Sequence, residues 1–253
     1  MGINLNNKSY NFDGKIAIFS DIHGNYQALT AILDDLKERE IKNIICLGDN
    51  MSLGPNPKEC LNLIIDNNIP MTLGNHELYY LKGTNNVKVQ KEGEKHHHSY
   101  ISECSNIKHK IFLESCPMRI TCNVGKIKVY FQHFIFNPNK DDIYPFDELS
   151  IIKNGLIYDR LDSLDCDLLF LGHEHYPFTI NHNNKKLICI GSSGCLEDDN
   201  TFYTILDPNN LTINKINLKY DREEFERIIN NLDNPKEHNV YRKFFGMSKK
   251  EID

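Results

Sequence analysis

No stretch of this 253-residue sequence approaches the apolar length of a membrane-spanning helix, and basic residues are not in excess. The first absence argues against a membrane protein. Residues 1–12 are polar and rich in asparagine, unlike a signal peptide, so we expect a cytoplasmic protein. The formal net charge of -6 offers no basic surface for a nucleic-acid backbone, so we do not expect a nucleic-acid partner.

The eight cysteines include no C-x-x-C pair. Several lie inside apolar runs, such as Cys46 and Cys189, where a reduced thiol serves as a small apolar side chain. We therefore expect buried thiols and neither disulfides nor a zinc cluster. The sequence also lacks a Cys-x₅-Arg loop, a Walker A segment, a Gly-x-Ser-x-Gly turn and a dinucleotide fingerprint, which argues against those enzyme classes.

The features that are present are typical of a globular α/β protein, with 40% apolar and 25% charged residues. Strands are expected at 15–20, 43–47 and 71–73, and amphipathic helices at 25–40 and 57–66. This order predicts a parallel sheet with right-handed crossovers. No composition break is visible, so we expect a single domain over residues 1–253, with a core at about 15–218 and a helical tail at 219–253.

Strand signals dominate the second half of the chain. They fall at 118–123, 126–132, 168–171, 178–181, 186–190, 202–206 and 211–217. Helices are expected within 97–115, near 158–164, at 222–231 and near 241–245, and a loop at 82–94. The pattern predicts two mixed sheets packed face to face with helices outside.

Polar side chains of ligand type follow the predicted strands in five segments. These are Asp21-Ile22-His23-Gly24-Asn25, Gly48-Asp49-Asn50, Gly74-Asn75-His76-Glu77, Gln132-His133 and Gly172-His173-Glu174-His175. Because the carboxyl ends of strands converge on one crevice in α/β sheets, we expect these side chains to meet. The glycines beside them allow sharp backbone turns.

Each segment alone also has a purely structural explanation. Asp21 could cap the following helix, and Gly74-Asn75-His76 could be a simple turn. His173 and His175 are harder to explain in this way, because histidines at sheet depth are costly unless something binds them. Five of the eleven histidines fall in these strand-end segments, and their joint occurrence favours a metal site.

The order D-x-H, G-D, G-N-H-[DE], H, G-H-x-H resembles the calcineurin-like metallophosphoesterases, from Lys15 to about Phe245. The segment from Gly48 to Pro57 and the tail after Tyr220 are similar to the small bacterial and archaeal phosphodiesterases and diadenosine-tetraphosphatase-like proteins of that family. The resemblance implies an α/β fold, a four-layer αββα sandwich of two mixed sheets with the site at its top edge.

The resemblance also implies a site for two divalent metal ions bridged by Asp49. The remaining ligands divide into Asp21, His23 and His175 for the first ion, and Asn75, His133 and His173 for the second. His76 is implied to stay unligated and to act as a general acid. Imidazole, carboxylate and amide ligands suit Mn²⁺, Fe and Zn²⁺. We expect Mn²⁺ first, with Fe or Zn²⁺ as alternatives.

The implied function is a metal-dependent phosphoric ester hydrolase, in which a hydroxide shared by the two metals attacks phosphorus. A phosphodiester, a phosphomonoester and a nucleotide pyrophosphate, including a dinucleoside polyphosphate, all stay open as the small substrate. A phosphoprotein phosphatase is disfavoured, because the segment from Gly48 to Gly54 lacks the arginine and second aspartate of G-D-x-x-D-R-G. Gly191-Ser192-Ser193-Gly194 resembles a family turn, but Cys195-Leu196-Glu197 replaces the residues that usually follow.

A catalytically silent scaffold of the same fold is the main alternative, and the presence of His76 with all seven implied ligands disfavours it. His96, His97 and His98 would point in different directions on a helix, so we expect a solvated or substrate-side face there. Four tyrosines near the motifs could stack a base or simply pack: Tyr79, Tyr80, Tyr144 and Tyr176. The sequence leaves open whether the protein forms a homo-oligomer.

Overall fold

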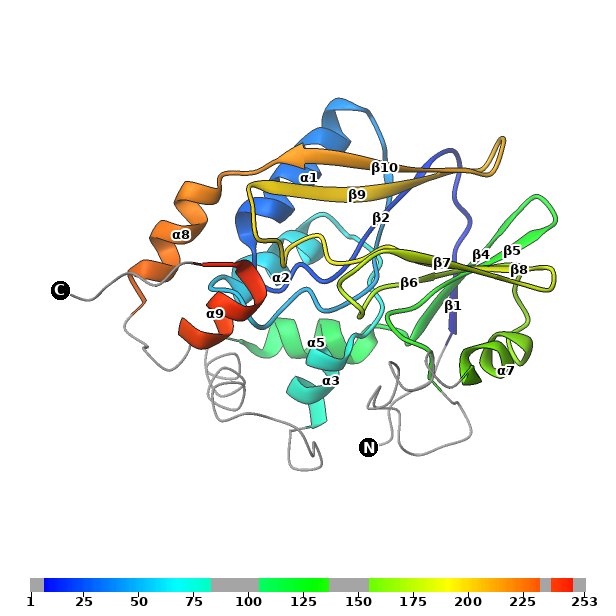
Figure 1. Cartoon of the computed structure of the whole chain (residues 1–253), viewed down its shortest axis with the longest axis horizontal. Coiled ribbons are helices and arrows are strands. Elements are labelled where there is room, and N and C mark those ends of the chain that lie inside the picture. The colour runs from blue at the N-terminus through cyan, green and yellow to red at the C-terminus, as the bar shows by residue number, and fades with distance from the viewer. Residues whose placement is uncertain (1–6, 83–104, 137–154, 233–237, 248–253) are drawn as a thin grey trace.

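The computed structural model describes residues 7–82, 105–136, 155–232 and 238–247. Two mixed β-sheets face each other at its centre (Figure 1). The smaller sheet has the order β10-β9-β2-β3 and consists of β2 (Ile16–Phe19), β3 (Asn43–Cys46), β9 (Asn200–Asp207) and β10 (Thr212–Lys219). Its strands β2 and β3 run parallel, while β9 is antiparallel to both neighbours.

The larger sheet has the order β1-β4-β5-β6-β8-β7. Its strands are β1 (Asn7–Ser9), β4 (Arg119–Val124), β5 (Ile127–Phe131), β6 (Leu168–Leu171), β7 (Phe178–His182) and β8 (Lys185–Cys189). Strand β6 lies parallel to both β5 and β8, and the hairpins β4–β5 and β7–β8 are antiparallel. Both sheets are therefore mixed, as the sequence predicts.

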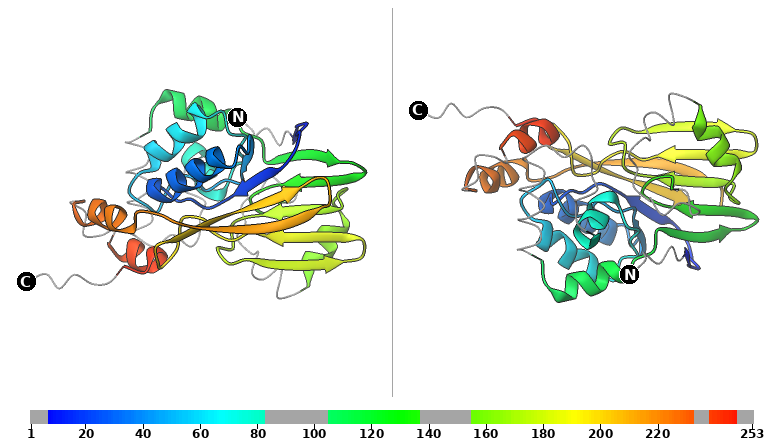
Figure 2. Two further views of the ribbon diagram at one scale, coloured as in Figure 1. Left: turned by 90° about the horizontal axis from the view of Figure 1, so that it is seen from above. Right: turned by 90° about the horizontal axis from the view of Figure 1, so that it is seen from below.

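Helices cover the outer face of each sheet (Figure 2). The first group is α1 (Tyr26–Glu38), α2 (Pro57–Asp66), α3 (Asn75–Lys82) and α5 (Ile107–Ser115), on the side of the smaller sheet. Helix α7 (Leu156–Asp162) packs on the larger sheet, and α8 (Arg222–Asn230) and α9 (His238–Phe245) lie together at one end. The order helix, sheet, sheet, helix confirms the expected αββα sandwich.

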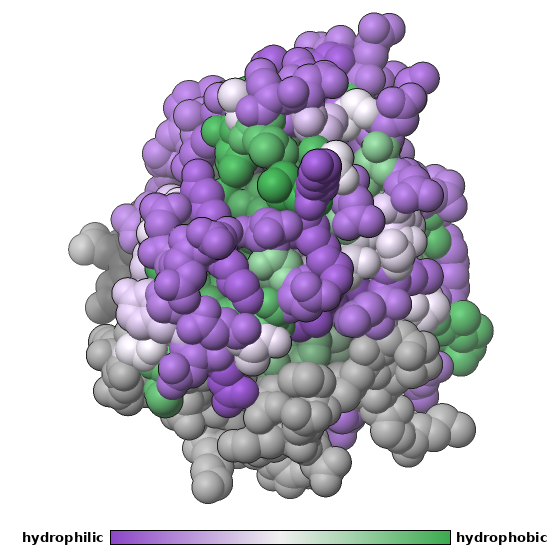
Figure 3. Space-filling model, turned by 90° about the vertical axis from the view of Figure 1, so that its right-hand side faces the viewer, coloured by the Kyte–Doolittle hydropathy of each residue, from purple (hydrophilic) through white to green (hydrophobic). Residues whose placement is uncertain are grey.

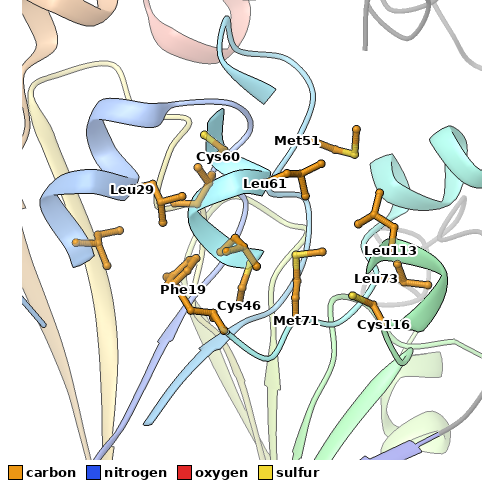
Figure 4. Close-up of a cluster of buried hydrophobic side chains, with 14 of the residues drawn as sticks. Phe19, Leu29, Cys46, Met51, Cys60, Leu61, Met71, Leu73, Leu113 and Cys116 are labelled. Carbon is orange, nitrogen blue, oxygen red and sulfur yellow. The ribbon is translucent and has the colours of Figure 1, made fainter. Parts of the chain in front are cut away.

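Three apolar clusters fill the spaces between these layers. Phe19, Leu29 and Leu61 belong to the cluster under the first group of helices (Figure 4). Ile18 and Phe170 belong to the cluster between the two sheets. Because strand side chains alternate, β2 sends Ala17 and Phe19 to the helices and Ile16 and Ile18 to the other sheet, which explains why it is apolar on both faces.

The third cluster lies between α7 and the larger sheet, where Leu161 packs with Leu169 and Leu187. A fourth joins the tail to α1, since Phe225 of α8 and Phe245 of α9 pack with Ala28. Figure 3 shows a patch of apolar residues surrounded by polar ones on one side of the molecule. Among the described residues, no helix is long and apolar enough to cross a bilayer.

Two elements differ from the expectation. Residues Asn7–Ser9 form strand β1 parallel to β4, although their exposed polar side chains carry no strand signal, because only the backbone pairs. The expected strand at 71–73 is reduced to one bridge between Met71 and Cys46, and helix α3 begins directly after it at Asn75. The loop expected at 82–94 begins at the last residue of α3 and otherwise lies outside the described residues, as do His96, His97 and His98.

Candidate metal centre

The predicted site residues follow strands of both sheets. Asp21 and His23 come after β2, and Asp49 comes after β3. His133 follows β5, while His173 and His175 follow β6. Asn75 and His76 open helix α3. The turns of β4–β5 and β9–β10 lie at the opposite strand ends, so the site sits at one edge of the sandwich.

The structure brings all eight side chains into one connected cluster. Asp49 Oδ2 lies 3.1 Å from His133 Nε2, 3.9 Å from His23 Nε2 and 4.0 Å from His76 Nε2. Asp21 Oδ1 lies 3.4 Å from His175 Nε2 and 3.9 Å from His133 Nε2.

Asn75 completes the cluster. Its Oδ1 lies 3.2 Å from His133 Nε2 and 2.9 Å from His173 Nδ1. His23 Nε2 and His175 Nε2 are 2.9 Å apart. The amide oxygen and the imidazoles thus converge around the two carboxylates, as expected from the positions of their strands.

The backbone of the site is strained. Five non-glycine residues have positive φ angles, at Asp21 (53°), His23 (50°), Asp49 (49°), His173 (70°) and His175 (57°). Each such conformation costs of order 1–3 kcal/mol and persists only when its surroundings hold it. Here the Asp21 amide donates to Gly48 O at 3.0 Å, and the His23 amide donates to Asp49 O at 2.9 Å. The two carboxylate-bearing loops therefore hold each other in place.

Two glycines permit the close approach of these loops. A Cβ at Gly74 would lie 2.1 Å from Asp49 Oδ1, and one at Gly172 would lie 2.6 Å from Asp21 Oδ2. A side chain at either position would displace a carboxylate that the chain places at the centre of the site.

We expect Gly74→Ala to shift Asp49 and to lower the metal content of the purified protein, because the methyl group meets the carboxylate and the Asp49 backbone. Gly125→Ala is the control: no atom lies within 4 Å of its Cβ position, and only its φ of 60° is strained. Elemental analysis and thermal unfolding of both variants separate the two effects. Equal metal content in the two proteins would contradict the prediction.

Glu77 is a residue of the site to which the sequence assigned no role. It is fully buried, and its carboxylate accepts hydrogen bonds from the amides of Asp49 (2.8 Å), Asn50 (3.0 Å), Met51 (3.3 Å) and Gly74 (2.9 Å). Burial and the nearby Asp49 charge raise the pKa of Glu77 to about 7. Its place in Gly74-Asn75-His76-Glu77 was the signal that could have found it. Glu77 positions the Asp49 loop.

The electrostatics of the site favour charged carboxylates and a neutral His173. Burial opposes the charged form of Asp49, but His133 and His76 hold its pKa well below the usual range. Asp21 behaves in the same way, since the nearby His133, His175 and His23 outweigh its burial and lower its pKa. Burial, with His133 nearby, lowers the pKa of His173 to about 4. Neutral imidazole and ionised carboxylate are the forms that bind metals.

His133 differs from His173. Burial alone would lower its pKa, but the charges of Asp49 and Asp21 outweigh this and raise the pKa of His133 to about 10. Since this value lies above the unfolded pKa of about 6.5, the interaction stabilises the metal-free protein fully below that pH. The contribution is lost as the pH rises through the folded value.

We expect metal binding to displace the His133 proton, so that metal affinity rises about tenfold per pH unit in the neutral range. Calorimetric titration of the metal-free protein with Mn²⁺, in two buffers of different ionisation enthalpy, measures the protons released. His133→Asn should release about one proton fewer than the wild-type chain. Equal proton release by the two proteins would contradict the prediction.

The residues present fit divalent metal ions. Among the described residues, none donates a hydrogen bond to the buried Asp21 Oδ1 or shares one with the buried His23 Nδ1. In the part of the chain that the structure describes, three groups of donors have ligand atoms within 4.8 Å of one another: His23, Asp49 and His76; Asp49, His133 and His173; and His23, His175 and Cys195. Asp49 belongs to two of these groups. Cys195 was not predicted.

The aromatic residues near the site divide into packed and exposed ones. Tyr79 is buried, with its ring centroid 5.5 Å from that of His76. Tyr176 is 51% exposed and lies against Phe178. Tyr80 is partly buried against the apolar cluster under the first group of helices, and Tyr144 lies outside the described residues.

Carboxylates and imidazoles gathered at strand ends are the type of centre that holds divalent ions in phosphoester hydrolases. The chain belongs to the calcineurin-like phosphoesterases, whose family model matches residues 14–177. It is 32% identical over 246 residues to the uncharacterized protein MJ0912 of Methanocaldococcus jannaschii, covering 85% of this chain and 92% of that protein.

Solved structures share the fold, among them the following two. A metallophosphoesterase from Sphaerobacter thermophilus has a TM-score of 0.68 at 23% identity, covering 92% of this chain and all of that one (100%). The hypothetical protein PH1004 from Pyrococcus horikoshii has a TM-score of 0.71 at 20% identity, with 93% and 99% covered. Family membership and the donor groups together indicate a phosphoester hydrolase that binds divalent metal and acts on small phosphate esters.

Proposed function

We propose that this chain uses two divalent metal ions to hydrolyse a phosphodiester, a phosphomonoester or a nucleotide pyrophosphate bond. One observation carries the proposal: Asp49 belongs to two groups of donors, one with His23 and one with His133. The same oxygen, Asp49 Oδ2, lies 3.9 Å from His23 Nε2 and 3.1 Å from His133 Nε2, so this one oxygen could serve an ion on each side. The charges of the ions would then hold a phosphate in an otherwise acidic protein.

The proposed ligands divide between two positions that share Asp49. The first comprises Asp21, His23 and His175, and the second Asn75, His133 and His173. Mn²⁺ is the first candidate for this set, with Fe or Zn²⁺ as alternatives. When bound, such ions supply positive charge and lower the pKa of a coordinated water.

The residues of the chain orient the reaction. Glu77 holds the amides of the Asp49 loop, which fixes the shared carboxylate. The His76 amide donates to Asp49 Oδ1 at 2.9 Å, so the His76 ring is held beside that carboxylate. Its side chain is 14% exposed and can reach a substrate. We assign His76 the role of general acid, which gives a proton to the leaving oxygen.

The proposed domain organisation is a single unit over residues 1–253. The support is the cluster in which Phe225 and Phe245 of the tail pack against Ala28 of helix α1. Arg222 also ties the tail to the core, since its guanidinium donates to Leu196 O at 2.9 Å.

The test is an activity screen of metal-free protein reconstituted with Mn²⁺, Fe²⁺ or Zn²⁺. The substrates are bis(p-nitrophenyl) phosphate, p-nitrophenyl phosphate and a dinucleoside polyphosphate, which separate the three bond types. We expect metal-dependent turnover of at least one, and none after chelation. If the protein binds two metal ions but hydrolyses none of the three substrates, the catalytically silent scaffold would be favoured.

A further inference from the structure

Cys195 lies beside the first metal position, where the family resemblance implies no thiol ligand. It follows Gly191-Ser192-Ser193-Gly194, at the point where this chain departs from the residues that usually follow that turn. Its ligand atom lies within 4.8 Å of those of His23 and His175. Among the cysteines of the described residues, Cys195 alone is partly exposed, and the others are buried.

The backbone holds Cys195 firmly against the metal loop. The Gly194 amide donates to Asp21 O at 3.1 Å, and the Ser192 hydroxyl donates to the same oxygen at 2.7 Å. The Cys195 amide in turn donates to Ser192 Oγ at 2.8 Å. A Cβ at Gly194 would lie 1.9 Å from Ile22 O, so the two loops touch without room for a side chain. The position of Cys195 is therefore fixed relative to Asp21 and His23.

A second observation points to a ligand at this place. Asp21 is fully buried, and among the described residues none donates a hydrogen bond to its Oδ1. This oxygen lies 3.4 Å from His175 Nε2 and 3.7 Å from His23 Nε2. Asp21 Oδ1 and Cys195 Sγ are thus both close to ligand atoms of the same two histidines, the sulfur within 4.8 Å of them. A cation held by His23 and His175 would also satisfy the oxygen that lacks a donor.

We propose that Cys195 Sγ is a further ligand at the first metal position and makes that position select Zn²⁺ or Fe²⁺ over Mn²⁺. The inference rests on the proposed function, since it assumes that Asp21, His23 and His175 hold an ion. Thiolates are soft ligands that favour zinc and iron, whereas carboxylates and water suit manganese. On binding, the thiol loses its proton to solvent and a sulfur–metal bond forms.

The two metal positions then differ in chemistry. The second position, with Asn75, His133 and His173, has only nitrogen and oxygen donors and accepts Mn²⁺. The first gains a sulfur donor in addition to its carboxylate and imidazoles. The chain would therefore hold a mixed pair of ions when both metals are present, which changes the Mn²⁺ expectation for one position only.

The test uses the full chain loaded with Co²⁺, whose bond to a thiolate gives a charge-transfer absorption in the near ultraviolet. We expect this band in the wild-type protein and its loss in Cys195→Ser. Cys104→Ser is the control, because Cys104 lies outside the described residues and is the other thiol to exclude. Cys104→Ser should keep the band, and its loss there would overturn the proposal.

Competition between Zn²⁺ and Mn²⁺, followed by elemental analysis, measures the selectivity. Cys195→Ser should lower the preference for Zn²⁺ at one position about 10- to 100-fold, the range found when groups that support a metal site are removed. X-ray absorption of the wild-type zinc protein should show a sulfur neighbour at about 2.3 Å, a readout that needs no variant.

The outcomes separate the two proposals. Wild-type protein that takes up no metal contradicts the proposed function and the Cys195 proposal together. Protein that binds two Co²⁺ ions without the band, and zinc protein without a sulfur neighbour, overturns the Cys195 proposal and leaves the proposed function intact.

Discussion

Replacing His76 by alanine is expected to lower kcat about 10²- to 10⁴-fold while both metals stay bound, which is the usual size of a general-acid contribution. His76 Nε2 lies 4.0 Å from Asp49 Oδ2, and its side chain keeps a small exposed surface. The family resemblance leaves His76 unligated, so the truncation is expected to remove a proton donor and no metal ligand. Turnover of the screened substrate and elemental analysis are measured on the same preparation.

His182→Ala is the matched control. His182 lies on β7, where it shares a hydrogen bond with exposed Asp162 at 3.0 Å, and it belongs to none of the donor groups. Its loss should leave turnover unchanged. The distances also place His76 near His23 and Asp49 as a third donor, so metal content decides its role. Unaltered turnover removes His76 from the mechanism, and a lost metal would make it a ligand.

The layers of the fold could be predicted because the spacing of apolar residues along the chain indicates which side chains are buried. Leu29, Ile32 and Leu36 of α1 are buried, as their spacing predicts, and Asn25 caps the helix by accepting from the Ala28 amide. Strand β1 was missed because its pairing to β4 uses only the backbone and leaves its side chains exposed. Alternation of apolar and polar residues cannot indicate a strand when neither face of that strand is buried.

The cluster of eight site residues could be predicted because each follows a strand or opens a helix at the same edge, and topology alone brings such ends together. Glu77 and Cys195 could not, for a different reason. Glu77 accepts from the amides of Asn50 and Met51, and the proposed role of Cys195 depends on its closeness to His23 and His175, all of which are distant along the chain. A sequence pattern shows residue types and spacing, but it does not show which distant amide or imidazole a side chain meets.

Asp49→Asn is expected to weaken metal binding at both positions, by roughly tenfold or more at each. Asp49 is the carboxylate shared by the donor groups of His23 and His133. Asparagine keeps an oxygen that can accept from the His76 amide, so the loop should stay folded, but it lacks the charge that attracts two cations. Elemental analysis after dialysis against limiting metal measures both losses.

Asp21→Asn distinguishes a shared ligand from an ordinary one. Asp21 Oδ1 lies 3.4 Å from His175 Nε2 and 3.7 Å from His23 Nε2, and 3.9 Å from His133 Nε2 of the second position. The family resemblance assigns Asp21 to the first position, so its replacement should empty that position and spare the second. The two variants have the same change of charge and similar burial, and they differ only in the place of the carboxylate. If Asp49→Asn also lost a single ion, Asp49 would serve one metal and the bridge would be wrong. Two ions held tightly by Asp49→Asn would remove the carboxylate from the ligand set altogether.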